Sequence, residues 1–221
     1  GQAKYLARIK AGKLCWLTEW YENGQKESEE KFKDGKGDGL FAEWYGNGQK
    51  RFEHNYKEGK KAGLGTSWYE NGQKKSEESY KDGKSVTALV WKPNGEKCPA
   101  TNLVNGNGVV VGYAENGQKK FEENYKDGQL NGLGTGWHPS GQKQGEGNFK
   151  NGKRNGLWTF WYENGQKREE GNFKEDKEDG AWIHYLEDGT EDFRITYKDG
   201  EKVHEALPAF ATLSPANPID E

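Results

Sequence analysis

Two groups of side chains in this 221-residue sequence could do acid–base or metal chemistry, namely the histidines and a series of adjacent glutamates. Histidine supplies a general base or a metal ligand near neutral pH, and paired carboxylates can share acid–base work or bind calcium. The histidines lie far apart and lack the short spacing of metal ligands, at His54, His138, His184 and His204. We expect them to take part in surface or cross-strand packing.

The adjacent glutamates recur at a regular interval, at Glu29-Glu30, Glu77-Glu78, Glu122-Glu123 and Glu169-Glu170. If these segments are strands, the two members of each pair point to opposite faces, so the pair cannot act on one substrate. A periodic glutamate column opposed by lysines indicates a solvated face. Ser140 stands where other copies of the motif have Asn, in a turn rather than a nucleophile elbow. The sequence therefore predicts no enzyme, no catalytic residue, no metal site and no cofactor.

The composition of the chain argues against nucleic-acid-binding and membrane proteins. Lys and Arg total 33 against 36 Asp and Glu, which gives a formal net charge of −3 and no basic excess for binding nucleic acid. The same lack of basic excess argues against binding to membrane lipid. No apolar run is long enough for a membrane span. The apolar content is carried by 9 Trp, 11 Tyr and 9 Phe, and the 32 glycines suit a β protein dense in turns.

A repeat of about 24 residues organises the chain. The tripeptide Asn-Gly-Gln or a close relative recurs with spacings of 24, 24, 23, 22, 24, 24 and 24 residues, its glycines being Gly24, Gly48, Gly72, Gly95, Gly117, Gly141, Gly165 and Gly189. Eight copies fill residues 12–206, between an N-terminal segment (residues 1–11) and a proline-rich tail (residues 207–221).

Each copy is predicted to be a pair of antiparallel strands. Asn-Gly favours a two-residue type I′ turn, because that turn needs a positive φ at both central residues. A second turn follows eleven residues later in most copies, as at Gly35. Tryptophans precede the first turn by four residues and tyrosines by three, so we expect two aromatic columns on opposite faces. These aromatics are the predicted partner-binding residues: Trp20, Trp44, Trp68, Trp137, Trp161, Tyr21, Tyr45, Tyr69 and Tyr162.

The pattern resembles the MORN repeat, in particular its bacterial variant. The match is close from Leu64 to Gly83, where a Trp-Tyr pair precedes Asn-Gly-Gln and a Glu and a Tyr precede Asp-Gly, and again over residues 156–173. The resemblance implies an elongated, twisted, single-layer antiparallel sheet of tandem hairpins. It also implies a scaffold, an antitoxin-like partner of a secreted toxin, or a secreted or surface protein of bacteria.

Three segments depart from the repeat. The copy at 84–113 is more apolar and contains Pro93 and Pro99, which indicates either a bend in the sheet or a discontinuity that binds a partner. The tail is expected to pack on its own sheet or on another chain. The N-terminal segment is expected to cap the sheet or to pair with a neighbouring chain. The predicted assembly residues are Tyr5, Leu6, Ile9, Leu207, Phe210 and Leu213.

Cys15 and Cys98 are three repeats apart, which corresponds to six strands or about 29 Å at the usual strand spacing. A disulfide needs Cα atoms within about 7 Å. We therefore expect no internal bridge, and both cysteines free or paired with another chain.

Three functions are weighed. The first is a binding module for a protein partner, because Trp and Tyr are favoured interface anchors. The second is a structural subunit that stacks head to tail into a fibre through open edge strands, with a second copy as its partner. The third is an enzyme, for which no constellation exists. The absence of Met and the small net charge favour an exported or cell-surface location.

Overall fold

The computed structural model describes residues 4–207, which form β-strands joined by turns and loops, with no helix in that range. The N-terminal strands are β1 (Tyr5–Lys10), β2 (Lys13–Trp20), β3 (Lys26–Lys33), β4 (Lys36–Trp44), β5 (Lys50–Lys57), β6 (Lys60–Lys61), β7 (Gly63–Trp68), β8 (Lys74–Lys81) and β9 (Lys84–Val90). They are followed by β10 (Gly108–Tyr113), β11 (Lys119–Lys126), β12 (Gln129–Trp137), β13 (Lys143–Lys150), β14 (Lys153–Trp161), β15 (Lys167–Lys174), β16 (Lys177–Tyr185), β17 (Glu191–Lys198) and β18 (Glu201–Ala206). The predicted all-β fold of tandem hairpins is confirmed.

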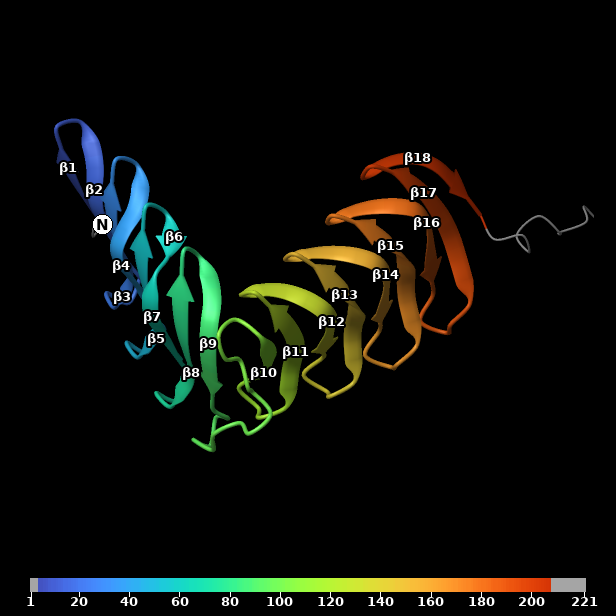
Figure 1. The fold of residues 1–221 in the computed structure, drawn as a ribbon, viewed down its shortest axis with the longest axis horizontal. Helices are drawn as coiled ribbons and strands as arrows, with labels where there is room; N and C mark the ends of the chain where they lie inside the picture. The colour runs from blue at the N-terminus through green and yellow to red at the C-terminus, as the bar shows by residue number, and fades with distance from the viewer. Residues whose placement is uncertain (1–3, 208–221) are drawn as a thin grey trace, which may run out of the picture. The chain divides into compact units, whose positions relative to one another are not determined.

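The strands form two antiparallel sheets in which successive strands pair in chain order (Figure 1). The first sheet contains β1 to β9, with the short β6 paired to β5, and the second contains β10 to β18. One continuous sheet was expected, so the break between β9 and β10 is a correction. It falls inside the divergent copy at 84–113. The chain also divides into two compact units, residues 1–132 and 133–221, which are described separately.

The tight turns lie at the second turn of each repeat, which is most often Asp-Gly, and not at the Asn-Gly-Gln motif. Lys33 pairs directly with Lys36, and the two residues between them, Asp34 and Gly35, have φ angles of 52° and 79°. Two successive positive φ angles are the requirement of a type I′ turn, whose twist matches that of the flanking strands. The expected geometry is therefore present, but at the second turn of the repeat.

The Asn-Gly motif forms a longer loop instead. In the first copy the loop is closed by hydrogen bonds from the Tyr21 amide to the Gln25 carbonyl (2.9 Å) and from the Gly24 amide to the Tyr21 carbonyl (3.0 Å). Only the glycine is left-handed, with φ of 84°. The Asn23 side chain accepts a hydrogen bond from the Gln25 amide (3.0 Å), which fixes the loop from inside. Asparagine is thus used here for its side chain and not for a left-handed backbone.

These loops also bind each repeat to the next. The Tyr21 hydroxyl donates to the carbonyl oxygen of Trp44 (2.8 Å), and the Asn23 amide group donates to that of Gly46 (2.7 Å). The same two bonds recur from Tyr45 and Asn47, from Tyr69 and Asn71, and from Tyr162 and Asn164. The tyrosines were expected on a sheet face. They lie in the loops instead, and their hydroxyl groups are used within the chain.

In the C-terminal unit, aromatic rings pack over glycines of neighbouring strands. Trp158 pairs with Gly147 and Trp182 pairs with Gly171, and a Cβ atom at either glycine would overlap the indole ring. With Phe173 the two tryptophans form a buried cluster, in which Trp182 is 2% exposed. Glycine in these strands therefore provides room for a large ring on a sheet that has no second layer to cover it.

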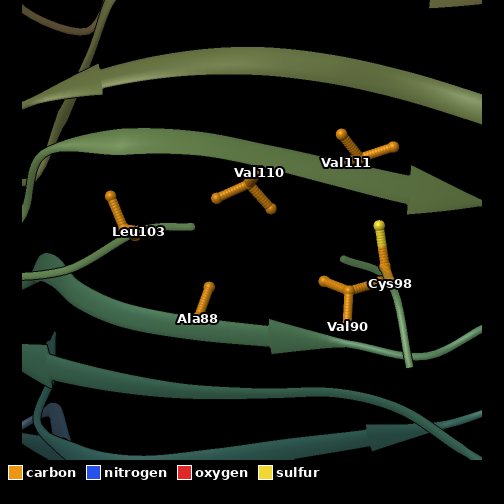
Figure 2. Close-up of a cluster of buried hydrophobic side chains, with 6 residues drawn as sticks. All are labelled: Ala88, Val90, Cys98, Leu103, Val110 and Val111. Atoms are coloured by element: carbon orange, nitrogen blue, oxygen red, sulfur yellow. The ribbon is translucent and has the colours of Figure 1, made fainter. Parts of the chain in front are cut away.

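A second buried cluster fills the break between the sheets, within the N-terminal unit. Figure 2 shows its members, which come from β9, from β10 and from the connection between them: Ala88, Val90, Cys98, Leu103, Val110 and Val111. Leu103 and Val111 are 2% and 0% exposed. The apolar run that set this copy apart in the sequence is therefore a small core.

The connection also occupies the facing edges of both strands. Cys98 donates its amide proton to the Val90 carbonyl on β9 (2.7 Å), and Asn102 donates to the Val109 carbonyl on β10 (2.9 Å). The Thr101 hydroxyl accepts from the Val111 amide (3.0 Å). The divergent copy thus interrupts strand pairing and satisfies the freed backbone groups itself. A role of this break in partner binding stays a prediction.

The N-terminal segment adds a strand to the first sheet, since β1 pairs with β2 from Tyr5 opposite Glu19 to Lys10 opposite Lys13. Its side chains are exposed, with Tyr5 at 65%, Leu6 at 54% and Ile9 at 66%. Leu207 is the last described residue and is 71% exposed. Phe210 and Leu213 lie outside the described residues.

The Gly171→Ala variant tests the seating of rings on glycines. A methyl group under Trp182 must displace a buried indole, so we expect the free energy of unfolding to fall by about 1–3 kcal/mol. The measurement is the urea midpoint followed by tryptophan fluorescence. The matched control is Gly46→Ala, because Gly46 has no left-handed φ and has open space at its Cβ position. An equal midpoint shift in both variants would contradict this account.

Candidate functional site

One face of the sheets repeats the same three residues along each first strand of a hairpin. Alternation along the strand places Leu64, Thr66 and Trp68 of β7 on one side. Equivalent triplets are Leu40, Ala42 and Trp44 on β4, Leu133, Thr135 and Trp137 on β12, and Leu157, Thr159 and Trp161 on β14. We call the side that carries these triplets the tryptophan face. The middle residue is small and mostly buried, as at Ala42 (2% exposed).

Lysines from the preceding repeat lie over several tryptophans of this face. The Lys26 ammonium lies 4.9 Å from the ring centre of Trp44 and 2.7 Å from a carboxylate oxygen of Glu29. The arrangement recurs with Lys50 over Trp68, with Lys74 over Trp91 and with Lys143 over Trp161. A cation over an indole ring is attractive by about 0.5–1 kcal/mol at an exposed site. The contact therefore favours one orientation of each of these tryptophan rings, and the lysines are already neutralised by glutamates.

The leucines of the triplets remain open to solvent. Leu40 is 38% exposed, Leu64 53%, Leu133 46% and Leu157 56%. Within one unit, neighbouring leucines are two strands apart, or about 9.6 Å. Large aliphatic side chains repeated in this way between polar rows form an apolar stripe of the kind found at protein interfaces. Sequence reasoning missed the stripe, although the signal was present as Leu eight residues before the turn glycine.

The predicted partner-binding residues are distributed between two environments. Trp20, Trp44, Trp68, Trp137 and Trp161 lie half-buried on the tryptophan face, and their role in binding stays a prediction. Tyr21, Tyr45 and Tyr162 are half-buried in loops. Tyr69 is 0% exposed, and burial raises the pKa of its hydroxyl, which donates to the Trp91 carbonyl. Tyr69 is therefore wrong as a contact residue, because no part of its side chain reaches the surface.

The opposite face of the N-terminal unit carries half-buried titratable groups. Burial raises the pKa of Glu123 and of Glu30, and nearby carboxylates add to the effect. Glu29, the sequence neighbour of Glu30, has a lowered pKa because Lys26 hydrogen-bonds its carboxylate. The members of this glutamate pair thus lie on opposite faces, as expected, and in different electrostatic surroundings.

His54 takes the place of an aromatic ring on this opposite face. Its ring packs over Gly65 and lies 5.8 Å from the ring of Tyr80, and its Nδ1 is buried without a hydrogen-bond partner. Burial lowers the pKa of His54 to about 4, and the positive charge of Lys61 lowers it further against the smaller opposing effect of Glu53. The imidazole is therefore neutral and acts as a packing group.

Both cysteines are free, as expected. The Cys15 thiol donates to the Arg8 carbonyl (3.0 Å). Cys98 is 2% exposed, which excludes the alternative of a bond to another chain in this conformation. Burial acts to raise the pKa of Cys98, but hydrogen bonds from the Tyr113 hydroxyl and from Thr101 outweigh it and lower the pKa overall.

The histidines form no common site in the described part of the chain. The Nε2 of His138 lies 2.9 Å from the Trp161 carbonyl, where other copies use a tyrosine hydroxyl. His184 stacks on Phe193 at 4.4 Å. Among residues 4–207, no three His, Cys, Asp or Glu side chains are close enough to hold a metal ion. No helix in that range could cross a membrane.

Comparison with known families identifies the repeat. A family model described as the MORN repeat variant matches residues 17–34, 61–82, 107–127, 130–151 and 154–175. No matched segment covers residues 83–106, which make up most of the divergent copy. No curated protein matches the chain.

The His54→Phe variant tests the neutral imidazole. The folded pKa of about 4 lies below the ordinary value of about 6.5, so the unfolded chain binds the proton more strongly. This contribution to stability is complete above about pH 6.5 and is lost as the pH falls towards 4. We expect the urea midpoint of the variant to fall less over this range than that of the wild type. The exposed His204, changed to Gln, serves as the control; equal acid sensitivity in all three proteins would contradict the assignment.

Proposed function

Because the chain belongs to the MORN repeat family and carries the variant form of the repeat, we propose that it is a non-enzymatic scaffold that binds a protein partner on its tryptophan face. The observation that carries the proposal is the stripe of exposed leucines beside half-buried tryptophans that lysines cover. Inhibition of a secreted toxin would be one form of such binding, and it stays a prediction.

The physical argument rests on preorganisation. A lysine paired with a glutamate already lies over Trp44, Trp68 and Trp161, so a partner that covers these rings orders few side chains on this chain. The Lys–Glu pairs are short, as in Lys50 with Glu53 at 2.6 Å, and they form polar rows beside the leucines. An apolar centre with polar surroundings is the usual anatomy of a protein interface.

Site-specific photocross-linking tests this proposal. Benzoylphenylalanine is placed at Leu64 or Leu157 on the tryptophan face, and at the exposed loop residue Glu163 as a control, in cells of the native source. We expect one discrete protein to be cross-linked from the face positions and not from the loop. Equal capture from face and loop positions, or no discrete product, would contradict the proposal.

Self-assembly is the second candidate, favoured by the exposed apolar edge strand β1 with Tyr5, Leu6 and Ile9. Unprotected edge strands pair with other chains. Light scattering of the purified chain decides between the two. A mass near 25.0 kDa supports the scaffold and sinks self-assembly, whereas growing particles that vanish in the Leu6→Lys variant support the fibre.

A further inference from the structure

In each repeat, one segment of the chain leads into the tight turn. The first two of these segments, β1 and β3, differ from all the later ones at one position. Four residues before the tight-turn glycine stand Arg8 and Lys31, whereas the later copies have small polar residues there, namely Asn55, Ser79, Asn102, Asn124, Asn148, Asn172 and Thr196. The strand between them also differs, because Trp16 stands where the triplets have leucine. Three departures therefore fall on three adjacent strands.

Strand pairing brings the three departures together in one row. Trp16 lies directly opposite Arg8 on one side and Lys31 on the other. The row borders a groove of about 740 Å³ that is lined by Arg8, Ile9, Lys10, Cys15, Trp16 and Lys31. This volume lies within the usual range for binding sites.

The groove is cationic in an acidic chain. Arg8, Lys10 and Lys31 are exposed, and none of them forms an ion pair with another residue in the range 4–207. The carboxylate beside the row, Glu29, already accepts hydrogen bonds from the Trp16 indole (3.2 Å) and from Lys26 (2.7 Å). The lysines over the tryptophans are each paired with a glutamate, whereas these three cations form no such pair, and only Lys31 is attracted by a carboxylate of the row, that of Glu29.

We propose that this groove binds an acidic segment of the protein partner, whose carboxylates meet Arg8, Lys10 and Lys31. One aromatic or aliphatic side chain of that segment packs against Trp16 and Ile9. The proposal rests on the scaffold function and gives the chemistry of its partner at the N-terminal end of the face. A small inorganic anion would contact the cations but leave Trp16 and Ile9 uncovered. Arginine is well suited to carboxylate recognition because its guanidinium can bind both oxygens.

The test uses a short fluorescent peptide of glutamates with one central phenylalanine, titrated with the whole chain. We expect binding that weakens as salt rises, since exposed charges are screened within about 10 Å at 0.1 M ionic strength. The double variant Arg8→Asn, Lys31→Asn installs the residue that later copies carry, so it should fold. It should bind the peptide at least about tenfold more weakly, the equivalent of about 1.4 kcal/mol.

The matched control is the double variant Lys57→Asn, Lys81→Asn, which removes the same charge from two exposed lysines that line no part of the groove. It should bind as the wild type does. Equal loss in both variants, or full binding of a peptide with alanine in place of phenylalanine, would show a non-specific or purely ionic contact and overturn the proposal. If cross-linking at Leu64 still captures a partner while the peptide fails to bind, the groove assignment falls and the scaffold function stands.

Discussion

A side chain of one repeat bonded to the backbone of the next is the interaction on which this structure depends. A hairpin of a single-layer sheet has no core of its own, so its stability must come from its neighbours. The Tyr21 hydroxyl and the Asn23 amide both reach the following repeat, at Trp44 and Gly46. Each loop is thereby closed on itself and tied to the next loop, which fixes the register of strands that are otherwise rich in charge.

The two faces of the single-layer sheet bury their aromatic rings in different ways. On the tryptophan face, half-buried rings are covered by lysines whose charge is neutralised, and leucines are left exposed beside them. On the opposite face of the C-terminal unit, glycines let Trp158 and Trp182 lie close to the sheet, where the two rings pack in one buried cluster. The first solution leaves a surface with apolar and polar rows, whereas the second encloses its aromatic rings.

The divergent copy shows what a repeat protein needs when pairing stops. Ending a sheet exposes unpaired amide and carbonyl groups on the last strand, and these are costly if buried and adhesive if exposed. The connection between β9 and β10 bonds to both strands and adds the core around Leu103 and Val111. The edges at the break are therefore covered by a segment of the same chain, which has lost the repeat pattern and gained aliphatic residues.

The sequence by itself determined the repeat, its pairs of antiparallel strands and the opposite facing of Glu29 and Glu30, because these follow from local period and from the frequency of turn residues. It also located the anomaly at 84–113 from composition. The tertiary structure alone decided that Asp34-Gly35 forms the tight turn, that Tyr69 is buried in a loop, that the sheet is interrupted, and that Arg8, Trp16 and Lys31 form one row. These outcomes depend on contacts between residues that are far apart in the sequence or on competition between two similar turns, and neither is encoded in the residues of one hairpin.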